Sequence, residues 1–514
     1  VLHSGLSMGV RLDEWKRIRA GEADVVVGTR SAVFAPLKNI GLIAVDEEQE
    51  GAYKSEQSPR YDARMVAAWI AKRHNALYLR MSATPSITAY HAAQTGKLAF
   101  FKLENRFGTA RLPQVDLIDM QKEQTVMPAG VLGMSLLEAL TVNMDQGHQS
   151  VLLLNRRGHD TVVTCFGCNT VMTCPRCSVA LNFHSANGRL MCHCCGYSRP
   201  FDTGCPQCGE KRMRTFGSGT QKVEAELKTL LPDARVLRMD TDTTYTKAAH
   251  DRLFEDFGGG KYDILLGTQM VAKGLDFENV TLAGVLNAEQ GLFSEDYKSG
   301  ERTFSLLTQV VGRCGRGRFS GKAIIQTYLP DHPIFGVAVR QDYEAFYAQE
   351  IALRSQMLHP PFCDVCLIGV SAPSERAARE GAMKILGMLA DLVEREYSEL
   401  PIKTFGPAPA SILKAADRYR YRLTVKCRNS PRFRQMVYRL LSGFAAEMGD
   451  RRDEAGVPGR ADHEVVADPD DRAHVEDHHR IRLLRVGGAS RDDCHVVGDG
   501  VGGRAVTAHR GARC

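Results

Sequence analysis

A short apolar run followed by acidic residues constrains this chain more than any other feature. Residues 42–45 are all apolar, and Asp46 and Glu47 follow at once. Such a run predicts a buried strand, and ligands of open α/β sheets bind beyond the carboxyl ends of the strands. An Asp there can hold Mg²⁺ on a nucleotide, and the next Glu can orient an attacking water. By itself the pattern is more typical of a strand before a solvated turn, so other segments must decide.

Two further apolar runs follow the same plan. Residues 24–31 change from apolar to small and polar at a Gly-Thr step, and residues 76–85 end in Ser-Ala-Thr-Pro. Helix-length segments such as 61–73 separate the runs. Strands that alternate with helices predict a parallel, doubly wound α/β sheet.

Length and composition bound the fold. The 514 residues exceed one ordinary hydrophobic core, so we expect three or more domains. No apolar run approaches the roughly 20 residues of a membrane span, and the net charge of +6 leans mildly toward anionic partners. Because the chain starts at Val1, without an initiator Met or a signal segment, we expect that it begins within a longer protein.

Cysteines cluster in one segment. The chain has fifteen of them, and eight form four C-x2-C pairs. Thiolates suit Zn²⁺, and each pair places two sulfurs on one tetrahedron. We predict two structural zinc ions that fold a module too small for its own core and do no chemistry. The predicted ligands are Cys165, Cys168, Cys174, Cys177, Cys192, Cys195, Cys205 and Cys208.

The spacing leaves two pairings of these thiols. Residues 178–191, between the second and third pairs, have the length of a zinc-ribbon loop, whereas residues 169–173 are short for a shared site. These lengths favour a nested arrangement, in which the middle pairs bind one ion and the outer pairs bind the other. Serial pairing is the alternative.

An arginine-rich segment stands in the second half of the chain. Residues 262–270 predict a strand, residues 272–277 follow, and residues 308–317 contain two Gly-Arg steps. An arginine that reaches the γ-phosphate of a nucleotide held by another lobe stabilises the transition state. Lobe closure then depends on the nucleotide. A flexible basic loop is the alternative for the isolated string.

In this order the segments resemble the motifs of superfamily 2 helicases. In detail they are similar to the primosomal replication-restart DNA helicases, the PriA family, over about residues 1–450. Residues 272–277 match motif V, and residues 308–317 match motif VI. The other matching segments are residues 2–4, 27–32, 46–48 and 82–86.

The resemblance implies an α/β fold with two RecA-like parallel-sheet lobes, at 1–105 and 106–330. A two-zinc Cys-rich module at 165–208 is inserted into the second lobe, and a small α+β domain of the DNA-binding type follows at 331–450. Basic residues alternate between 417 and 427 of that domain, which predicts a strand with one basic face. A merely solvated face is the alternative.

The last segment departs from the family. Residues 451–514 contain no Phe, Tyr, Trp, Lys, Met, Asn or Gln. Such a composition could not bury a useful core. We therefore expect this tail to be disordered or translated out of frame.

The resemblance assigns roles to the nucleotide-site residues. Asp46 is expected to hold Mg²⁺, Glu47 to position the attacking water, and Arg313 and Arg316 to complete the site from the second lobe. The two other implied nucleotide contacts are Gly274 and Asp276.

Aromatic residues interleaved with Lys and Arg between 53 and 64 resemble the family's aromatic-rich loop, which couples DNA contact to ATP hydrolysis. Rings stack on bases, and cations neutralise phosphates. A helix start near Pro59 with a solvated basic face is the alternative, and both can hold. The expected DNA contacts are Thr29, Arg30, Tyr53, Lys54, Arg60, Tyr61, Thr268 and Lys273.

The resemblance implies an ATP-dependent 3′→5′ DNA helicase that recognises stalled or collapsed forks and D-loops and initiates primosome assembly. The implied cofactors are ATP, Mg²⁺ and two Zn²⁺ ions. The implied partners are DNA, including single strands, primosome proteins and single-stranded DNA-binding protein. We expect a monomer in the bacterial cytoplasm, associated with the nucleoid and not with a membrane. A non-hydrolysing zinc-ribbon DNA-binding or scaffold protein is the alternative.

The chain lacks one required feature of the family, the phosphate loop. No G-x-x-x-x-G-K-[ST] segment occurs in it. The family has this loop shortly before Leu-His-Ser, so we expect it, with the N-terminal DNA-binding domain, upstream of Val1. Residues 1–514 are therefore predicted to have little or no ATPase activity. Gln49, Leu275 and Gln221 also differ from the family's His, His and Glu, which affects fine coupling rather than class.

Overall fold

The computed structural model divides the chain into two compact units, Val1–Cys363 and Asp364–Cys514. None of the helices in its described part has the length and hydropathy needed to cross a bilayer. The structure describes residues 1–3, 5–55, 60–103, 112–123, 130–155, 162–165, 172–175, 181–184, 188–191, 197–201, 204–205, 207–209, 213–216, 220–239, 247–268, 277–293, 296–315, 319–449 and 464–469.

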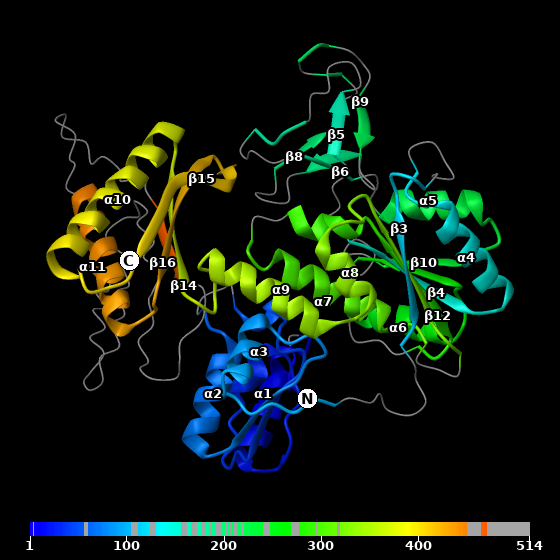
Figure 1. Cartoon of the computed structure of the whole chain (residues 1–514), viewed down its shortest axis with the longest axis horizontal. Coiled ribbons are helices and arrows are strands. Elements are labelled where there is room, and N and C mark those ends of the chain that lie inside the picture. Colours follow the sequence, from blue (N-terminus) through cyan, green and yellow to red (C-terminus); the bar gives the residue numbers. More distant parts are fainter. Residues whose placement is uncertain are drawn as a thin grey trace, which may run out of the picture. The chain divides into compact units, whose positions relative to one another are not determined.

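The first lobe contains a two-stranded parallel sheet, β1 (Leu42–Val45) and β2 (Leu77–Arg80). Helix α2 (Ala63–His74) connects the strands, and helices α1 (Met8–Ala20) and α3 (Ile87–Gln94) complete the lobe (Figure 1). Helix α2 buries alanines four residues apart, so one face packs closely on the sheet. The buried alanines are Ala63, Ala67 and Ala71.

Two expectations for this lobe are wrong. Residues 25–27 form no strand, because Leu2 offers a single bridge to Gly28 before α1 begins, and Val25 and Val27 are exposed. A short 3₁₀ helix, Arg30–Phe34, follows. Strand β1 is present, but only Val45 of its four residues is buried. The described part of this sheet has two strands, which leaves most of β1 uncovered.

The second lobe is built on a six-stranded parallel sheet in the order β10-β11-β4-β12-β13-β3, which confirms the predicted α/β class. Strands β4, β11 and β12 are buried along their whole length, and β11 lies within the strand predicted at 262–270. The strands are β3 (Gln114–Asp119), β4 (Gln149–Leu154), β10 (Val236–Met239), β11 (Ile264–Gly267), β12 (Val280–Leu286) and β13 (Lys322–Thr327).

Two separate cores form on this sheet, because neighbouring residues of β4 point to opposite faces. Val151 and Leu153 enter one core, and Leu152 and Leu154 enter the other. The first core includes residues of α6–α9, and the second includes residues of α4 and α5 (Figure 1). The helices are α4 (Met134–Asp145), α5 (Thr220–Leu230), α6 (Lys247–Gly258), α7 (Ser299–Val311), α8 (Pro333–Val339) and α9 (Tyr343–Gln356), with a 3₁₀ helix at Ala288–Phe293.

A small antiparallel sheet is inserted between β4 and α5, where the Cys-rich module was expected. Its strand order is β8-β7-β6-β5-β9. The strands are β5 (Val162–Cys165), β6 (Asn182–His184), β7 (Arg189–Met191), β8 (Ser198–Pro200) and β9 (Met213–Phe216).

The second unit is an α+β domain whose antiparallel sheet has the order β15-β16-β14-β17. Residues of helices α10 and α11 share one apolar core with the sheet. On β16, odd-numbered residues from Tyr421 to Cys427 are buried, and the basic residues alternate with them, which confirms the one-sided strand. The elements are β14 (Asp364–Ala372), α10 (Glu375–Glu396), β15 (Lys403–Ala415), β16 (Arg418–Cys427), α11 (Pro431–Gly449) and β17 (Glu464–Pro469).

Two predicted boundaries of this domain are corrected. The unit begins at Asp364 instead of 331, because Phe335 of α8 and Phe346 of α9 belong to the core of the first unit. Residues 464–469 of the expected disordered tail form β17, which pairs with β14. The edge of an existing sheet supplies hydrogen-bond partners to a segment that cannot build a core alone. The rest of 451–514 lies outside the described residues.

Candidate nucleotide site

A cavity of about 300 Å³ joins the acidic residues of the first lobe to helix α7 of the second lobe. Asp46 and Glu47 lie at the carboxyl end of β1, as expected for a ligand site of an α/β sheet. Gln309, in the last turn of α7, faces them. The lining residues are Thr29, Arg30, Asp46, Glu47, Glu50, Ala52, Tyr53 and Gln309.

Glu47 is held in a strained backbone conformation. Its φ of 47° lies in the left-handed region, which costs a non-glycine residue roughly 1–3 kcal/mol. Its N–H donates to Asp46 Oδ1 at 2.9 Å. Its Oε2 accepts from Gln49 Nε2 at 2.5 Å and from Gln309 Nε2 at 3.1 Å. The turn therefore aims the carboxylate of Glu47 at the second lobe, in a fixed orientation.

A hydrogen-bonded network extends from this carboxylate to the Ser-Ala-Thr segment. Ser82 Oγ donates to Gln49 Oε1 at 2.6 Å and accepts from the Thr84 N–H at 2.9 Å. Thr84 Oγ1 and Ser305 Oγ of α7 are 2.8 Å apart and buried. Both first-lobe segments after the two strands are thus joined to α7.

Tyr53 ties the aromatic loop to the acidic motif. Its hydroxyl donates to the carbonyl oxygen of Asp46 at 2.6 Å. Burial raises the pKa of Tyr53 above its ordinary value, and the charge of Asp46 adds to the effect, so the hydroxyl keeps its proton. Arg30 Nη1 donates to the carbonyls of Ala52 at 3.0 Å and Lys54 at 2.9 Å. The loop is therefore fastened at both ends of its 3₁₀ turn, Gly51–Tyr53.

The basic side of this loop leads into α2. Lys54 forms an isolated bridge with Asp62, whose carboxylate caps α2 through the N–H of Arg64 at 2.8 Å. The ring of Tyr61 packs edge-on against Phe34, with centroids 4.9 Å apart. Arg60 is exposed. The predicted helix start is confirmed at Ala63, and the DNA role of the loop stays a prediction.

Some of the remaining predicted residues line the cavity and others do not. Arg313 follows α7, and its N–H bonds to the Val310 carbonyl, but its side chain does not line the cavity. Thr268 follows β11 and is half-buried. Thr29 and Arg30, expected at DNA, line the acidic cavity instead. The positions that lie outside the described residues are Lys273, Gly274, Asp276 and Arg316.

Sequence reasoning missed Gln309 and the role of Tyr53. Gln309 lies within residues 308–317, the segment that matches motif VI, and this match could have drawn attention to it. The hydroxyl of Tyr53 bonds to a backbone carbonyl, which leaves no trace in the sequence.

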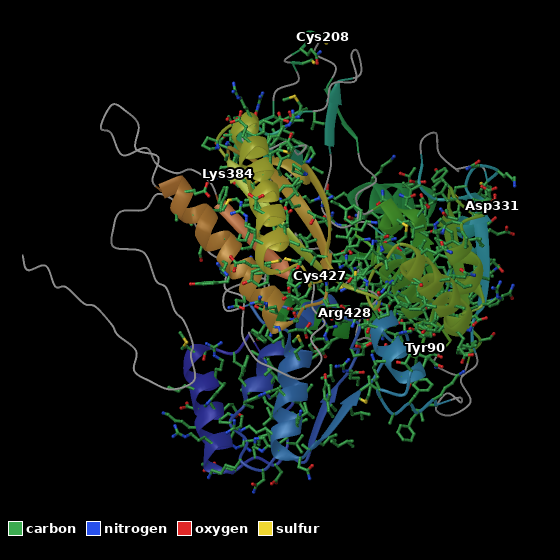
Figure 2. The ribbon with its side chains drawn as sticks, turned by 60° about the vertical axis from the view of Figure 1, so that its left-hand side comes forward. Tyr90, Cys208, Asp331, Lys384, Cys427 and Arg428 are labelled. Carbon is green, nitrogen blue, oxygen red and sulfur yellow. The ribbon has the colours of Figure 1, made fainter. Side chains whose placement is uncertain are left out.

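The described part of the Cys-rich module fits thiolate ligands. Cys174 and Cys205 are buried, and the Gln207 N–H donates to Cys205 Sγ at 3.4 Å. Thiolate sulfur is the form of cysteine that binds Zn²⁺. Cys208 is exposed (Figure 2). Within the described residues no three potential ligands come together, and the side chains of Cys165, Cys168, Cys177, Cys192 and Cys195 are outside that part.

Three family descriptions match the chain. Residues 174–200 match the PriA DNA helicase Cys-rich region domain, and residues 209–318 match the helicase conserved C-terminal domain. Residues 355–469 match the primosomal protein N C-terminal domain. The last match begins at the end of α9 and extends through β17, in agreement with the strand observed in the expected tail.

Curated relatives match over most of the chain. The replication restart protein PriA of Bacillus subtilis (strain 168) is 42% identical over 448 residues, which are 87% of this chain and 55% of that protein. The same-named protein of Synechocystis is 39% identical over 83% of this chain and 52% of its own length. That of Treponema pallidum is 36% identical over 87% of this chain and 67% of its own length. The chain thus spans about half the length of the first two relatives.

Proposed function

Because this chain belongs to the family of the replication restart protein PriA, we propose that it serves as the motor region of an ATP-dependent 3′→5′ DNA helicase. The substrates in this proposal are stalled or collapsed forks and D-loops, and the outcome is primosome assembly. The observation that carries it is the contact between Glu47 and Gln309, which brings the two lobes together around one acidic cavity.

The cavity suits a nucleotide phosphate with its metal. Carboxylate oxygens are the ligands that Mg²⁺ prefers, and Asp46 provides one at the cavity wall. Mg²⁺ bound there would neutralise charge on the phosphates. Glu47 would accept a proton from the attacking water, while Gln309 and Gln49 keep its carboxylate oriented. Arg313, Arg316, Gly274 and Asp276 are proposed to reach the nucleotide when the lobes close.

Helicase polarity tests this proposal directly. A segment with the family's phosphate loop, which the resemblance implies ahead of Leu-His-Ser, can be joined ahead of residue 1. This chimera is expected to displace a strand from duplexes with a 3′ single-stranded tail and not from those with a 5′ tail. Displacement with either tail, or none despite ATP hydrolysis, would contradict the proposed polarity or the proposed helicase.

A non-hydrolysing DNA-binding or scaffold protein is the second candidate, because the chain has no phosphate loop. In that case the chimera binds DNA but shows no DNA-stimulated ATPase. We propose primosome proteins and single-stranded DNA-binding protein as further partners, with a monomer acting in the bacterial cytoplasm at the nucleoid.

The aromatic loop is proposed to bind single-stranded DNA, with the remaining predicted contacts at Thr268 and Lys273. Arg60→Ala is expected to weaken binding of a single-stranded oligonucleotide. The slope of log K against log salt should fall by about 0.7, the value for one lost phosphate contact. Fluorescence anisotropy at several salt concentrations measures this slope. Lys16→Ala on α1 removes the same charge elsewhere and should leave the slope unchanged; equal slopes for both variants would refute the contact.

The zinc pairing is proposed to be nested. Strands β6 and β7 pair Asn182 with Met191, within the stretch of sequence between the two middle pairs. Strands β5 and β9 pair Cys165, of the first outer pair, with Met213, which follows the last outer pair in the sequence. Both pairings support a nested arrangement.

Metal content decides between the pairings. The native chain is expected to contain two Zn²⁺ ions by mass spectrometry. Serine at both outer pairs, 165/168 and 205/208, should leave one ion if the pairing is nested and none if it is serial. Serine at the first two pairs, 165/168 and 174/177, should leave no ion if the pairing is nested and one ion if it is serial. Cys363→Ser, outside the module, should retain both ions.

A further inference from the structure

Helix α3 belongs to the first lobe by sequence but is built into the core of the second lobe. Ile87, its first residue, is fully buried in the cluster that includes Phe304 and Phe346. The ring of Tyr90 packs edge-on against Tyr343 and Tyr347 of α9, with centroids 5.0 and 4.7 Å apart. The segment after the Ser-Ala-Thr motif is therefore anchored in the second lobe.

A buried charge cluster holds the start of this helix. The Ile87 N–H donates to Glu301 Oε1 of α7 at 3.0 Å, and Arg354 Nη2 donates to Glu301 Oε2 at 2.8 Å. Arg354 Nε donates to Glu350 Oε1 at 2.7 Å, and Nη1 donates to the Pro360 carbonyl at 3.3 Å. Arg354 is 1% exposed, Glu301 8% and Glu350 9%. Each carboxylate oxygen of Glu301 thus has a different partner, one in each lobe.

The same face of α7 carries two more contacts to the first lobe. Glu301, Ser305 and Gln309 are spaced by four residues, so they lie along one stripe. Glu301 contacts the start of α3, Ser305 contacts Thr84, and Gln309 contacts Glu47. The stripe runs from the charge cluster to the acidic cavity. A shift of α7 at one end therefore moves the group that orients Glu47 at the other.

Arg354 keeps its charge in this environment. Burial lowers the pKa of Arg354, but the carboxylates of Glu301 and Glu350 more than offset this and hold it above its ordinary value. The aromatic face of Tyr297, 5.2 Å from the guanidinium, adds a further cation contact. Burial also raises the pKa of Glu350 above its ordinary value, although Arg354 opposes this effect.

We infer that Glu301 and Arg354 form a positioning pair, which fixes α7 against the first lobe and thereby sets the contact of Gln309 with Glu47. Arg354 orients Glu301 so that one oxygen stays available to the Ile87 N–H. The geometry of this link is independent of activity, whereas its consequence for hydrolysis rests on the proposed function.

Glu350 provides a matched comparison, because it is bonded to the same arginine and is equally buried, but it forms no hydrogen bond with the described residues of the first lobe. Glu301→Gln and Glu350→Gln each remove one negative charge that lies next to Arg354. The Ile87 N–H and Arg354 approach different oxygens of Glu301. In this geometry a glutamine at 301 keeps only one of the two contacts, because its amide nitrogen donates and does not accept. If the cluster only stabilised the fold, the two substitutions would change the position of α7 to a similar extent.

A disulfide reporter measures the position of α7. Cysteines are introduced at Thr84 and Ser305 of the full chain, whose side-chain oxygens are 2.8 Å apart. Their effective concentration is obtained from the disulfide equilibrium in glutathione buffers, quantified on the linked peptides by mass spectrometry. The thermal midpoint is recorded for each variant.

Glu301→Gln is expected to lower the effective concentration at least tenfold, and Glu350→Gln less than twofold, although both lower the thermal midpoint. If Glu301→Gln prevents folding, Arg354→Lys, which keeps the charge but loses the fork, should give a smaller decrease. Equal effects of the two glutamines, or no decrease with either Glu301→Gln or Arg354→Lys, would overturn the inference. A decrease with an inactive chimera would leave the positioning pair intact and refute only the proposed function.

Discussion

Residues 1–514 are expected to hydrolyse ATP no faster than buffer alone, with or without DNA. The chain has no Gly-rich phosphate loop and no lysine from such a loop to neutralise the β- and γ-phosphates. Asp46 and Glu47 alone leave the nucleotide without its main phosphate contacts. A coupled assay with and without a single-stranded oligonucleotide measures the rate. DNA-stimulated ATP hydrolysis by residues 1–514 would contradict the proposal that the nucleotide site needs a phosphate loop in addition to Asp46 and Glu47.

The chimera with a phosphate loop gives the complementary result. It is expected to hydrolyse ATP in response to DNA, and Glu47→Gln in that background should lower kcat about 10²–10⁴-fold, the range for loss of a general base. Glu22→Gln, an exposed substitution after α1, is the matched control and should leave kcat unchanged. Similar rates for the chimera and its Glu47→Gln variant would remove Glu47 from the mechanism.

Arg354→Met is expected to destabilise the first unit by about 3–5 kcal/mol, because it leaves the carboxylates of Glu301 and Glu350 buried without their cation. Urea unfolding followed by circular dichroism measures this change. The transition of the first unit should move, while that of the second unit, which lacks Arg354, should not.

A surface pair is the control for this substitution. Arg376 and Glu380 of α10 have the same i,i+4 spacing as Glu350 and Arg354, but they are mostly exposed. Exposed pairs contribute little to stability, so Arg376→Met should leave the free energy of unfolding nearly unchanged. If both substitutions had small effects, the cluster around Arg354 would not be the buried ion network that the structure describes.

The sequence predicts local elements well where burial and spacing coincide. The strand predicted at 262–270 contains β11, whose residues are all buried because helices cover both faces of that sheet. The acidic motif after β1 was placed correctly at a strand end. The parallel α/β class and the inserted Cys-rich module follow from the same kind of local signal.

Features that depend on distant partners were not predictable. Residues 24–31 have the composition of a strand, but a strand also requires a neighbour along its length, which Leu2 cannot provide. The predicted C-terminal domain at 331–450 included helices α8 and α9. Their residues Phe335 and Phe346 instead belong to the core of the first unit. The contact of Gln309 with Glu47 joins residues 262 positions apart.

The most direct test of the two-lobe site joins Glu47 to Gln309 chemically. Cysteines at both positions, in residues 1–514, are treated with a short bismaleimide, and the linked peptides are identified by mass spectrometry. Since the native side chains meet at 3.1 Å, we expect rapid intramolecular linkage between positions 47 and 309. A variant with only one of the two introduced cysteines should react with the reagent at that position but form no link between positions 47 and 309. Full reaction at both cysteines without a linked peptide would show that the acidic motif and α7 do not share a cavity, and the account would fail.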